Sequence, residues 1–350
     1  MTPRQRLERA LARTEKAHGA TAQGGLVFRA DAIFDENLVK ELLGQPGKVL
    51  TNEAGRPVAG HVDDPSLLPA MLAVIEAGDR GLIPPGLILV DAVGLASNYN
   101  KTLRRKGAPY LFELGKLPTA EIERRMYIES YKGITDIVTK YVWPVPALYV
   151  TRICARCGIS PNMVTLLSFI CVLLATWAFV VGAFGAGLIA AWAMCFLDTV
   201  DGKLARVTLT SSKWGNIFDH GTDLVHPPFW YWAWYAGLGG AASVAPWVLW
   251  VIIAGYVLGR GQEGLFIWRF GIEMHIWRPL DSIFRLFTAR RNPNLLILSA
   301  AVILGAPDKG FEIVAWWTIL SFAFHCFRIA QAFGVRARGL HLQSWLTEAA

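Results

Sequence analysis

The stretch LDTVDGKLARVTLTSSKWGNIFDHGTDLVH, residues 197–226, decides both the fold and the chemistry expected of this chain. It places four aspartates among the apolar residues of membrane helices: Asp198, Asp201, Asp219 and Asp223. A carboxylate at membrane depth is costly, and it usually lines a polar cavity and marks function. Four such groups repel one another unless a cation lies between them. The stretch therefore predicts a divalent-metal site.

The spacing of the aspartates supports a single shared site. The first two are three residues apart and the last two are four apart, so each pair falls on one face of a helix. A site made only of oxygen ligands favours Mg²⁺ or Mn²⁺ over zinc. Gly202 leaves room for a ligand or a second helix, and Arg206, one turn further on, can bind a diphosphate through its planar guanidinium.

The same positions match a known sequence motif. The pattern D-x2-D-G-x2-A-R-x8-G-x3-D-x3-D is met without a departure between residues 198 and 223. On this motif, residues 130–335 resemble the CDP-alcohol phosphotransferase family, also called CDP-alcohol phosphatidyltransferases. The segment SPNMVT, residues 160–165, is similar to the PNxxT of that family. The resemblance does not cover residues 1–120.

The resemblance implies a cofactor, a set of site residues and a reaction. Two divalent ions are expected to be held by Asp198, Asp201, Asp219 and Asp223, with the CDP diphosphate bridging them. The residues expected to bind the nucleotide are Gly202, Ala205, Arg206, Gly215, Asn162 and Thr165. Asp223, the last aspartate of the motif, is expected to be the general base that takes the proton of the acceptor hydroxyl. The acceptor oxygen then attacks phosphorus, and CMP leaves.

A function without catalysis is the alternative. Carboxylates in membrane helices also build ion and proton pathways, so a membrane carrier or channel is a second class of function. The fixed DG and AR elements of the motif fit an enzyme better. CMP release that depends on a metal ion distinguishes the two classes, because a carrier would move solute without it.

The composition and the apolar runs indicate a polytopic membrane protein. Of the 350 residues, 53% are hydrophobic and 17% are charged, which is unlike a soluble domain. Since a helix needs about 20 apolar residues to cross a membrane, the runs predict six spans, near residues 162–184, 185–204, 216–238, 244–262, 293–306 and 312–334. We therefore expect an all-α membrane domain of six transmembrane helices over residues 161–335, with a tail at 336–350.

The distribution of basic residues predicts the orientation of these spans. Residues 182–187 and 236–245 contain no lysine or arginine, whereas basic residues follow the second and fourth spans and occur again in the tail. Basic loops stay in the cytoplasm. We therefore expect the N-terminal region, the active site and the tail to face the cytoplasm.

The N-terminal region, residues 1–125, is expected to be a small cytoplasmic α/β domain. Strand-like runs at 25–28, 48–51 and 86–90 alternate with helical runs at 36–43 and 66–77. The segment from Arg29 to Val62 resembles the middle of a sugar-nucleotidyltransferase domain, in which Asp31 would lie beside the metal. The glycine-rich basic loop that grips a nucleotide triphosphate in that family is missing. A degenerate structural or regulatory remnant is therefore expected, and a second active domain is the alternative.

Residues 126–160 join the two domains and are expected to lie along the membrane surface. Aromatic side chains alternate there with basic ones, as in Tyr141, Trp143 and Tyr149 beside Lys140 and Arg152. Such rings favour the depth of the lipid headgroups while the basic tips reach water. The segment YKGITD, residues 131–136, looks like the lead-in of fused enzymes that make di-inositol phosphates from CDP-inositol.

The substrates are less well determined by the sequence. The donor is expected to be CDP-diacylglycerol or a CDP-polyol, and the acceptor a polyol or a lipid, with phospholipid headgroup synthesis preferred over di-inositol-phosphate synthesis. Arg260 and Arg269 are candidates for an anionic acceptor pocket, although arginines beside spans also serve to anchor helices. The net charge of +7 fits membrane lipids rather than nucleic acid. The oligomeric state, including a homodimer, is left open.

Overall fold

The computed structural model describes residues 2–18, 25–101, 103–211 and 213–347, and it leaves the side chains of residues 16–18, 213, 214, 216, 219 and 220 undescribed. The chain divides into two compact units. The first comprises residues 1–131 together with 207–209, and the second comprises 132–206 and 210–350. Most of the described chain is helical, and the strands lie in the first unit.

The first unit is a small α/β structure, as the sequence predicts. Its helices are α1 (Pro3–His18), α2 (Glu36–Gly44), α3 (Leu68–Ala77), α4 (Ala92–Leu95) and α5 (Thr119–Glu129), with 3-10 turns at Pro65–Leu67 and Arg80–Leu82. Its strands are β1 (Gly25–Phe28), β2 (Ala32–Phe34), β3 (Lys48–Thr51), β4 (Pro57–Val62), β5 (Ile88–Val90), β6 (Tyr99–Asn100), β7 (Arg105–Lys106) and β8 (Leu111–Glu113).

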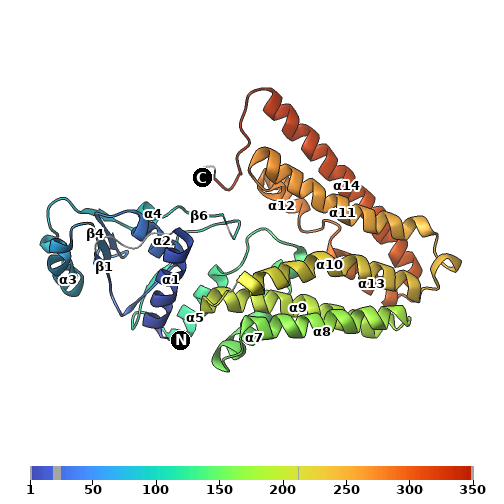
Figure 1. Ribbon diagram of the computed structural model, residues 1–350, viewed down its shortest axis with the longest axis horizontal. Helices are drawn as coiled ribbons and strands as arrows, with labels where there is room; N and C mark the ends of the chain where they lie inside the picture. The colour runs from blue at the N-terminus through green and yellow to red at the C-terminus, as the bar shows by residue number, and fades with distance from the viewer. Residues whose placement is uncertain (1, 19–24, 102, 212, 348–350) are drawn as a thin grey trace. The chain divides into compact units, whose positions relative to one another are not determined.

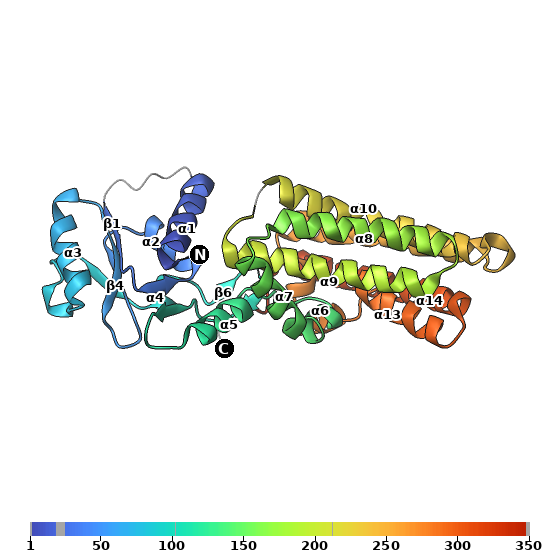
Figure 2. The same cartoon turned by 90° about the horizontal axis from the view of Figure 1, so that it is seen from below.

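A four-stranded sheet with the order β1-β4-β3-β5 forms the centre of this unit. The β1–β4 and β3–β4 pairs are antiparallel, and only β3 and β5 run parallel. Every residue of β4 is buried, because α3 packs on one face of the sheet and α1 and α2 lie on the other (Figure 2). Leu38, Leu42 and Leu50 belong to the core between the sheet and α2. Two smaller antiparallel pairs, β2–β8 and β6–β7, complete the unit.

The second unit is built from helices (Figure 1). Two short helices come first, α6 (Ile137–Tyr141) and α7 (Pro144–Arg156), and a third, α12 (Pro279–Phe284), lies between long ones. The long helices are α8 (Pro161–Val180), α9 (Phe184–Thr208), α10 (Lys213–Gly237), α11 (Pro246–Phe270) and α14 (Pro307–Ala337), and the shorter α13 (Arg291–Ile303) precedes the last of them. Single 3-10 turns occur at Gly240–Ala242 and Met274–Ile276.

Six of these helices fall where the sequence predicts six spans, and among the described residues three of them, α8, α9 and α14, are long and apolar enough to cross a membrane. Helix α13 has 13 residues, fewer than the roughly 20 that a bilayer requires. The count of six spans therefore stays a prediction. The first predicted span, 162–184, extends beyond the end of its helix. Helix α8 ends at Val180. Gly182, with a φ of +75°, then forms the turn into α9.

One hydrophobic core holds the long helices together. Phe179 of α8, Met194 of α9 and Trp234 of α10 are each at most 1% exposed, and they meet Ile252 of α11 and Phe311 of α14 in the same cluster. Helix α10 packs against α8 and α11, and α14 packs against α11 and α13. The close approach of α8 and α10 depends on Gly237, since a Cβ there would lie 1.9 Å from the carbonyl oxygen of Phe179.

Helix α7 lies within the segment 126–160 that is predicted to follow the membrane surface, and it has one exposed apolar face and one buried face. Val145, Tyr149 and Ile153 are 58–65% exposed and follow one another every four residues along one side. Ala147 and Thr151 are buried on the other side. An amphipathic helix of this kind fits a position in the membrane surface, with its apolar face among the lipids.

Candidate active site

Two motif aspartates are joined by an arginine from a third helix. The Nη2 atom of Arg291, the first residue of α13, lies 2.6 Å from Oδ2 of Asp198 on α9. Its Nη1 atom lies 2.5 Å from Oδ1 of Asp223 on α10. The aspartates are 93 and 68 residues away from Arg291 in sequence. The predicted convergence of the two carboxylate helices is thus observed for these two residues.

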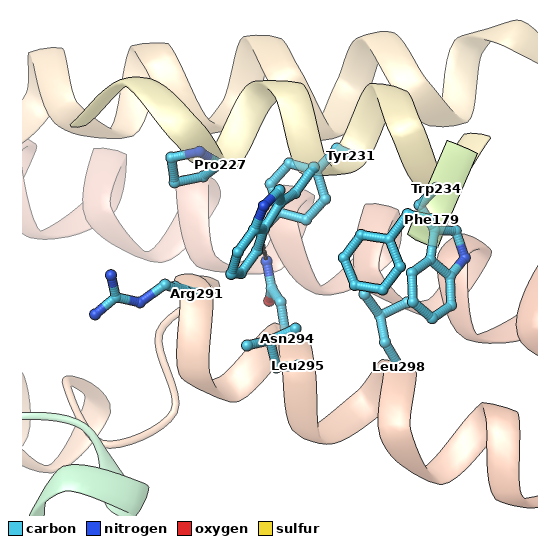
Figure 3. Close-up of a pocket in the computed structure, with 9 residues that line it drawn as sticks. Phe179, Pro227, Tyr231, Trp234, Arg291, Asn294, Leu295 and Leu298 are labelled. Atoms are coloured by element: carbon cyan, nitrogen blue, oxygen red, sulfur yellow. Dashed lines mark hydrogen bonds between the residues drawn. The ribbon is translucent and has the colours of Figure 1, made fainter. Parts of the chain in front are cut away.

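Figure 3 shows how Arg291 is oriented. Its guanidinium points away from the aromatic side chains of Phe179 and Trp234, which lie further along the helices. Behind it, Asn294 of α13 donates a 2.7 Å hydrogen bond to the hydroxyl of Tyr231 on α10. The cavity beside these residues is only about 10 Å³, too small for a substrate. This apolar packing ties α13 to α10 and so sets the position of Arg291.

Asp201 makes a different contact. Its Oδ2 atom accepts a 2.7 Å hydrogen bond from the hydroxyl of Thr165 on α8. Asp201 is 3% exposed, and its buried Oδ1 atom has no hydrogen-bond partner among the side chains that the structure describes. A buried carboxylate oxygen without a donor is costly, and a bound cation would remove that cost. The contact also brings the PNxxT segment of α8 to the aspartate motif of α9.

The residues present fit a divalent ion. The donor set consists of carboxylate oxygens, which Mg²⁺ and Mn²⁺ prefer. The Arg291 guanidinium between Asp198 and Asp223 shows that these groups are arranged around positive charge. Among the side chains that the structure describes, no group of three His, Cys, Asp or Glu residues is close enough to hold a metal ion. The Asp219 side chain is outside the described set, so the full set of four ligands stays a prediction.

The residues expected to bind the nucleotide follow the aspartates along the same helices. Gly202, Ala205 and Arg206 lie on α9 after Asp201, and all three are partly buried. A Cβ at position 202 would come within 3.3 Å of Nη1 of Arg206, so the glycine leaves space for that guanidinium. Gly215 is a partly buried residue in the first turn of α10.

The PNxxT residues lie at the start of α8. Asn162 is exposed in the first turn, whereas Thr165 is buried against Asp201. Thr165 is thus placed with the motif.

A larger cavity of about 370 Å³ opens beside Asp223. Asp223 is the one motif aspartate among its described lining residues. The charged side chains of its wall are four arginines and two aspartates: Arg260, Arg285, Arg290, Arg291, Asp136 and Asp223. An excess of guanidinium groups around a concave space favours an anionic ligand, because arginine binds phosphate oxygens in a bidentate manner.

Glu263 of α11 holds two of the arginines in the wall. Its Oε1 atom pairs with Nη2 of Arg290 and lies 3.3 Å from Nη2 of Arg260. The same oxygen is 3.2 Å from Nε2 of His275. A shared carboxylate orients the guanidiniums and lowers their repulsion.

The structure separates the two arginines that the sequence suggested for the acceptor. Arg260 lines the cavity beside Asp223. Arg269 is exposed near the end of α11, where its guanidinium packs over the rings of Phe270 and Phe333 at 5.8 and 5.9 Å. It is absent from the described lining of this cavity.

Asp136 connects the segment before the first long helix to the cavity. It caps the N-terminus of α6, and its Oδ1 atom accepts a 2.9 Å hydrogen bond from Asn292 of α13. Burial would raise the pKa of Asp136, but the hydrogen bonds from Thr139 and Asn292 and the charge of Arg285 lower that pKa below its ordinary value. Asp136 and Arg291 were not predicted as site residues. A signal was present in the arginine pair immediately before the apolar run of α13.

The family comparison agrees with this geometry. The model of the CDP-alcohol phosphatidyltransferase family matches residues 158–327, a range that contains the aspartate motif, Thr165 and Arg291. The chain carries a CDP-alcohol phosphatidyltransferase domain. The resemblance predicted from the motif is therefore confirmed for residues 158–327, which match a family of transferases of substituted phosphate groups.

One curated relative matches a short part of the chain. An archaetidylinositol phosphate synthase of Pyrococcus horikoshii is 41% identical to the chain over 70 residues. The match covers 20% of this chain and 37% of the synthase. The chain is thus similar to little more than a third of that enzyme.

Proposed function

We propose that this protein transfers a phosphorylated alcohol from a CDP-linked donor to the hydroxyl of an acceptor and releases CMP, in the synthesis of phospholipid headgroups. The observation that carries the proposal is the position of Asp223. The side chains of Asp223 and Asp198 pair with the same guanidinium, that of Arg291. Asp223 is also the one motif aspartate in the described wall of the 370 Å³ cavity. A carboxylate between a metal-binding motif and a substrate cavity is suited to act on the acceptor.

On the donor side, the four motif aspartates would hold two Mg²⁺ or Mn²⁺ ions, in a family that is generally dependent on divalent metals. When bound, the ions neutralise the diphosphate and stabilise the charge that develops on the attacking and leaving oxygens. Arg206 lies one turn beyond Gly202 and would pair with the diphosphate. The orphaned Oδ1 atom of Asp201 supports its assignment as a ligand.

On the acceptor side, Asp223 would accept the proton of the attacking hydroxyl. The acceptor oxygen forms a bond to the phosphorus that carries the alcohol. The bond from that phosphorus to the bridging oxygen of the diphosphate breaks, and CMP leaves with that oxygen. The phosphoalcohol ends on the acceptor, so neither an oxidant nor a reductant is needed.

The arginines of the cavity support a phosphorylated polyol as the acceptor. Four guanidiniums lie in the wall, and their planar N–H groups match the oxygens of a phosphate better than the hydroxyls of a neutral polyol. Arg260 is the arginine that we assign to the acceptor phosphate. The name of the related archaetidylinositol phosphate synthase is consistent with an inositol phosphate in this place and with CDP-diacylglycerol or a similar CDP-linked lipid as donor.

A di-inositol-phosphate synthase that uses CDP-inositol is the second candidate. Its support is the segment YKGITD, residues 131–136, whose last residue, Asp136, lines the cavity.

The membrane orientation is also part of the proposal: six spans, with the N-terminal unit and the active site facing the cytoplasm. The three apolar helices α8, α9 and α14 support an integral membrane protein.

The experiment is CMP release by the purified protein with Mg²⁺ or Mn²⁺. CDP-diacylglycerol and CDP-inositol are each tested against inositol, inositol phosphate and glycerol phosphate. We expect CDP-diacylglycerol with inositol phosphate to release CMP, and EDTA to stop the reaction. Release only from CDP-inositol would favour the second candidate. Solute flux by the folded, metal-loaded protein without CMP release would favour a carrier.

The first control is Asp223→Asn. The amide keeps the shape of the side chain but cannot act as a base, so we expect turnover to fall by about 10²–10⁴-fold while the unfolding midpoint changes little. Turnover close to that of the wild type would remove Asp223 from the role of base.

A further inference from the structure

Two consecutive prolines interrupt the helix that carries Asp223. Pro227 and Pro228 lie in the interior of α10. A proline has no backbone N–H, so the carbonyl four residues earlier loses its helical donor. In α10 these carbonyls belong to Asp223 and Leu224. The carbonyl groups of Asp223 and Leu224 therefore lack the amide donors that a regular helix would supply.

A tyrosine of the neighbouring helix supplies a donor to both carbonyls. The hydroxyl of Tyr256 on α11 lies 3.2 Å from the carbonyl oxygen of Asp223. It lies 3.0 Å from the carbonyl oxygen of Leu224. The single O–H of Tyr256 is within hydrogen-bond distance of both oxygens that the proline pair leaves without an amide, and it can donate to either or be shared between them. A carbonyl that is withdrawn from water without a donor is costly, so the contact with the partly buried carbonyl of Asp223 helps to secure this turn of α10 to α11.

Asp223 is thus held at two points. Its side chain pairs with Arg291 at 2.5 Å, and its main chain accepts from Tyr256. Proline pairs are sites at which helices bend, so the direction of the Asp223 side chain depends on what restrains the bend. Tyr256 also lines the cavity, and its ring lies 5.7 Å from the guanidinium of Arg260.

We propose that Tyr256 is a positioning residue: its hydroxyl donates to the carbonyls that lack an amide donor because of Pro227 and Pro228, and it fixes the turn of α10 that directs Asp223 into the cavity. The inference rests on the proposed function in that Asp223 acts on the acceptor. A small displacement of a reacting group can cost a large factor in rate. The absence of the hydroxyl should consequently affect turnover more than substrate binding.

The test is a double-mutant cycle between the tyrosine and the prolines. Tyr256→Phe removes the hydroxyl and keeps the ring beside Arg260. Pro227→Ala/Pro228→Ala restores the two backbone N–H groups. Tyr235→Phe is the matched control, because the Tyr235 hydroxyl also donates to a main-chain carbonyl, that of Val244 at 3.2 Å, far along α10 from the aspartates.

We expect Tyr256→Phe to lower kcat roughly tenfold, the equivalent of one lost buried hydrogen bond, with less than about a threefold change in KM for the donor. In the Pro227→Ala/Pro228→Ala background, the same change should alter kcat by less than about twofold, because backbone amides now serve the carbonyls. Tyr235→Phe should leave kcat within about twofold of the wild type. If the double proline variant does not fold, Pro227→Ala alone restores the amide to Asp223.

A second readout does not depend on activity. The unfolding midpoint of the metal-free protein in detergent should fall on Tyr256→Phe in the wild-type background and fall less in the proline variant. An equal loss in both backgrounds, in kcat and in midpoint, would overturn the inference. If the wild type releases no CMP with any substrate pair, the proposed function fails, and the non-additivity of the unfolding midpoints still decides whether Tyr256 holds this turn.

Discussion

Asp31 in the N-terminal unit and Asp198 in the membrane unit each pair with an arginine, but the pairs differ in sequence separation and in exposure. Arg29 is two residues from Asp31, and the Asp31 side chain is 49% exposed. Arg291 is 93 residues from Asp198, whose side chain is 19% exposed. The first pair is a local surface contact. The second exists only because two helices converge, and it shares its arginine with Asp223.

The difference shows what turns an aspartate into a candidate ligand. Asp31, which the nucleotidyltransferase resemblance would place beside a metal, has both carboxylate oxygens in contact with its neighbour Arg29. This hydrogen-bonded pair lowers the pKa of Asp31, but it uses the oxygens that a metal would need. In the second unit, Asp201 keeps one buried oxygen that has no hydrogen-bond partner within the described part of the chain. This contrast supports the interpretation of the N-terminal unit as a structural remnant. It also supports the prediction that the active site lies among the helices of the second unit.

The largest effect is expected from a change in the buried pair. Asp198→Ala removes a proposed ligand and leaves Arg291 with Asp223 alone. We expect CMP release to fall by at least about a hundredfold and the metal concentration for half-activity to rise at least about tenfold. Metal titration followed by CMP release and by Mn²⁺ binding checks this. An unaltered titration would exclude Asp198 from the ligand set.

A smaller effect is expected from the cavity wall. Arg260→Gln should raise KM for a phosphorylated acceptor roughly tenfold, because a charge-assisted hydrogen bond contributes about 1.5–3 kcal/mol, while KM for the donor changes little. Arg269→Gln is the matched control, since Arg269 packs on two rings outside the described lining of the cavity. Equal effects of both substitutions would mean that the arginines act through the net positive charge of the protein and that Arg260 makes no specific contact with the acceptor phosphate.

The effect at Asp136 should appear as a pH dependence of stability. The folded-state pKa of Asp136 is lowered from 3.8. Its contribution is therefore fully present above pH 3.8 and is lost as the pH falls through the lower folded-state pKa. We expect the unfolding midpoint of the wild type to fall more steeply than that of Asp136→Asn below about pH 3.8. Parallel curves for the two proteins would show that the capped carboxylate contributes no such linkage.

The smallest effect is expected at Asp31. Asp31→Asn breaks an exposed pair, and such pairs contribute about 0–1 kcal/mol. CMP release should be unaltered, and the unfolding midpoint should change little. The measurement compares both quantities with those of Asp198→Ala in the same preparation. A large loss of turnover would show that the N-terminal unit takes part in the reaction and would remove the contrast between the two pairs.

Much of the fold could be predicted because it depends on local patterns. The strand-like runs at 25–28 and 48–51 are β1 and β3, and the helical run at 36–43 is α2. The six apolar runs correspond to six helices, with ends that differ by up to eight residues. Periodicity and hydropathy cannot show whether a helix crosses the membrane when its apolar part is short, as in α13, or interrupted by charges, as in α11.

The site was predicted in part. The aspartate motif and Thr165 were identified, and the structure places Asp198, Asp201 and Asp223 on the expected helices with Thr165 against Asp201. The partners of these residues were missed. Arg291 belongs to the basic residues that follow the fourth predicted span. Nothing in a single sequence relates it to aspartates 68 and 93 residues away.

The sequence by itself determined which carboxylates share a helix face, because the 3.6-residue period makes spacings of three and four a local geometric fact. Once α10 has formed, Pro227 and Pro228 leave the carbonyls of Asp223 and Leu224 without amide donors. The tertiary structure alone decided which groups meet these needs: Arg291 between Asp198 and Asp223, and the Tyr256 hydroxyl at the two carbonyls. Such contacts depend on how helices pack against one another, and packing is a property of the whole core that no local pattern specifies.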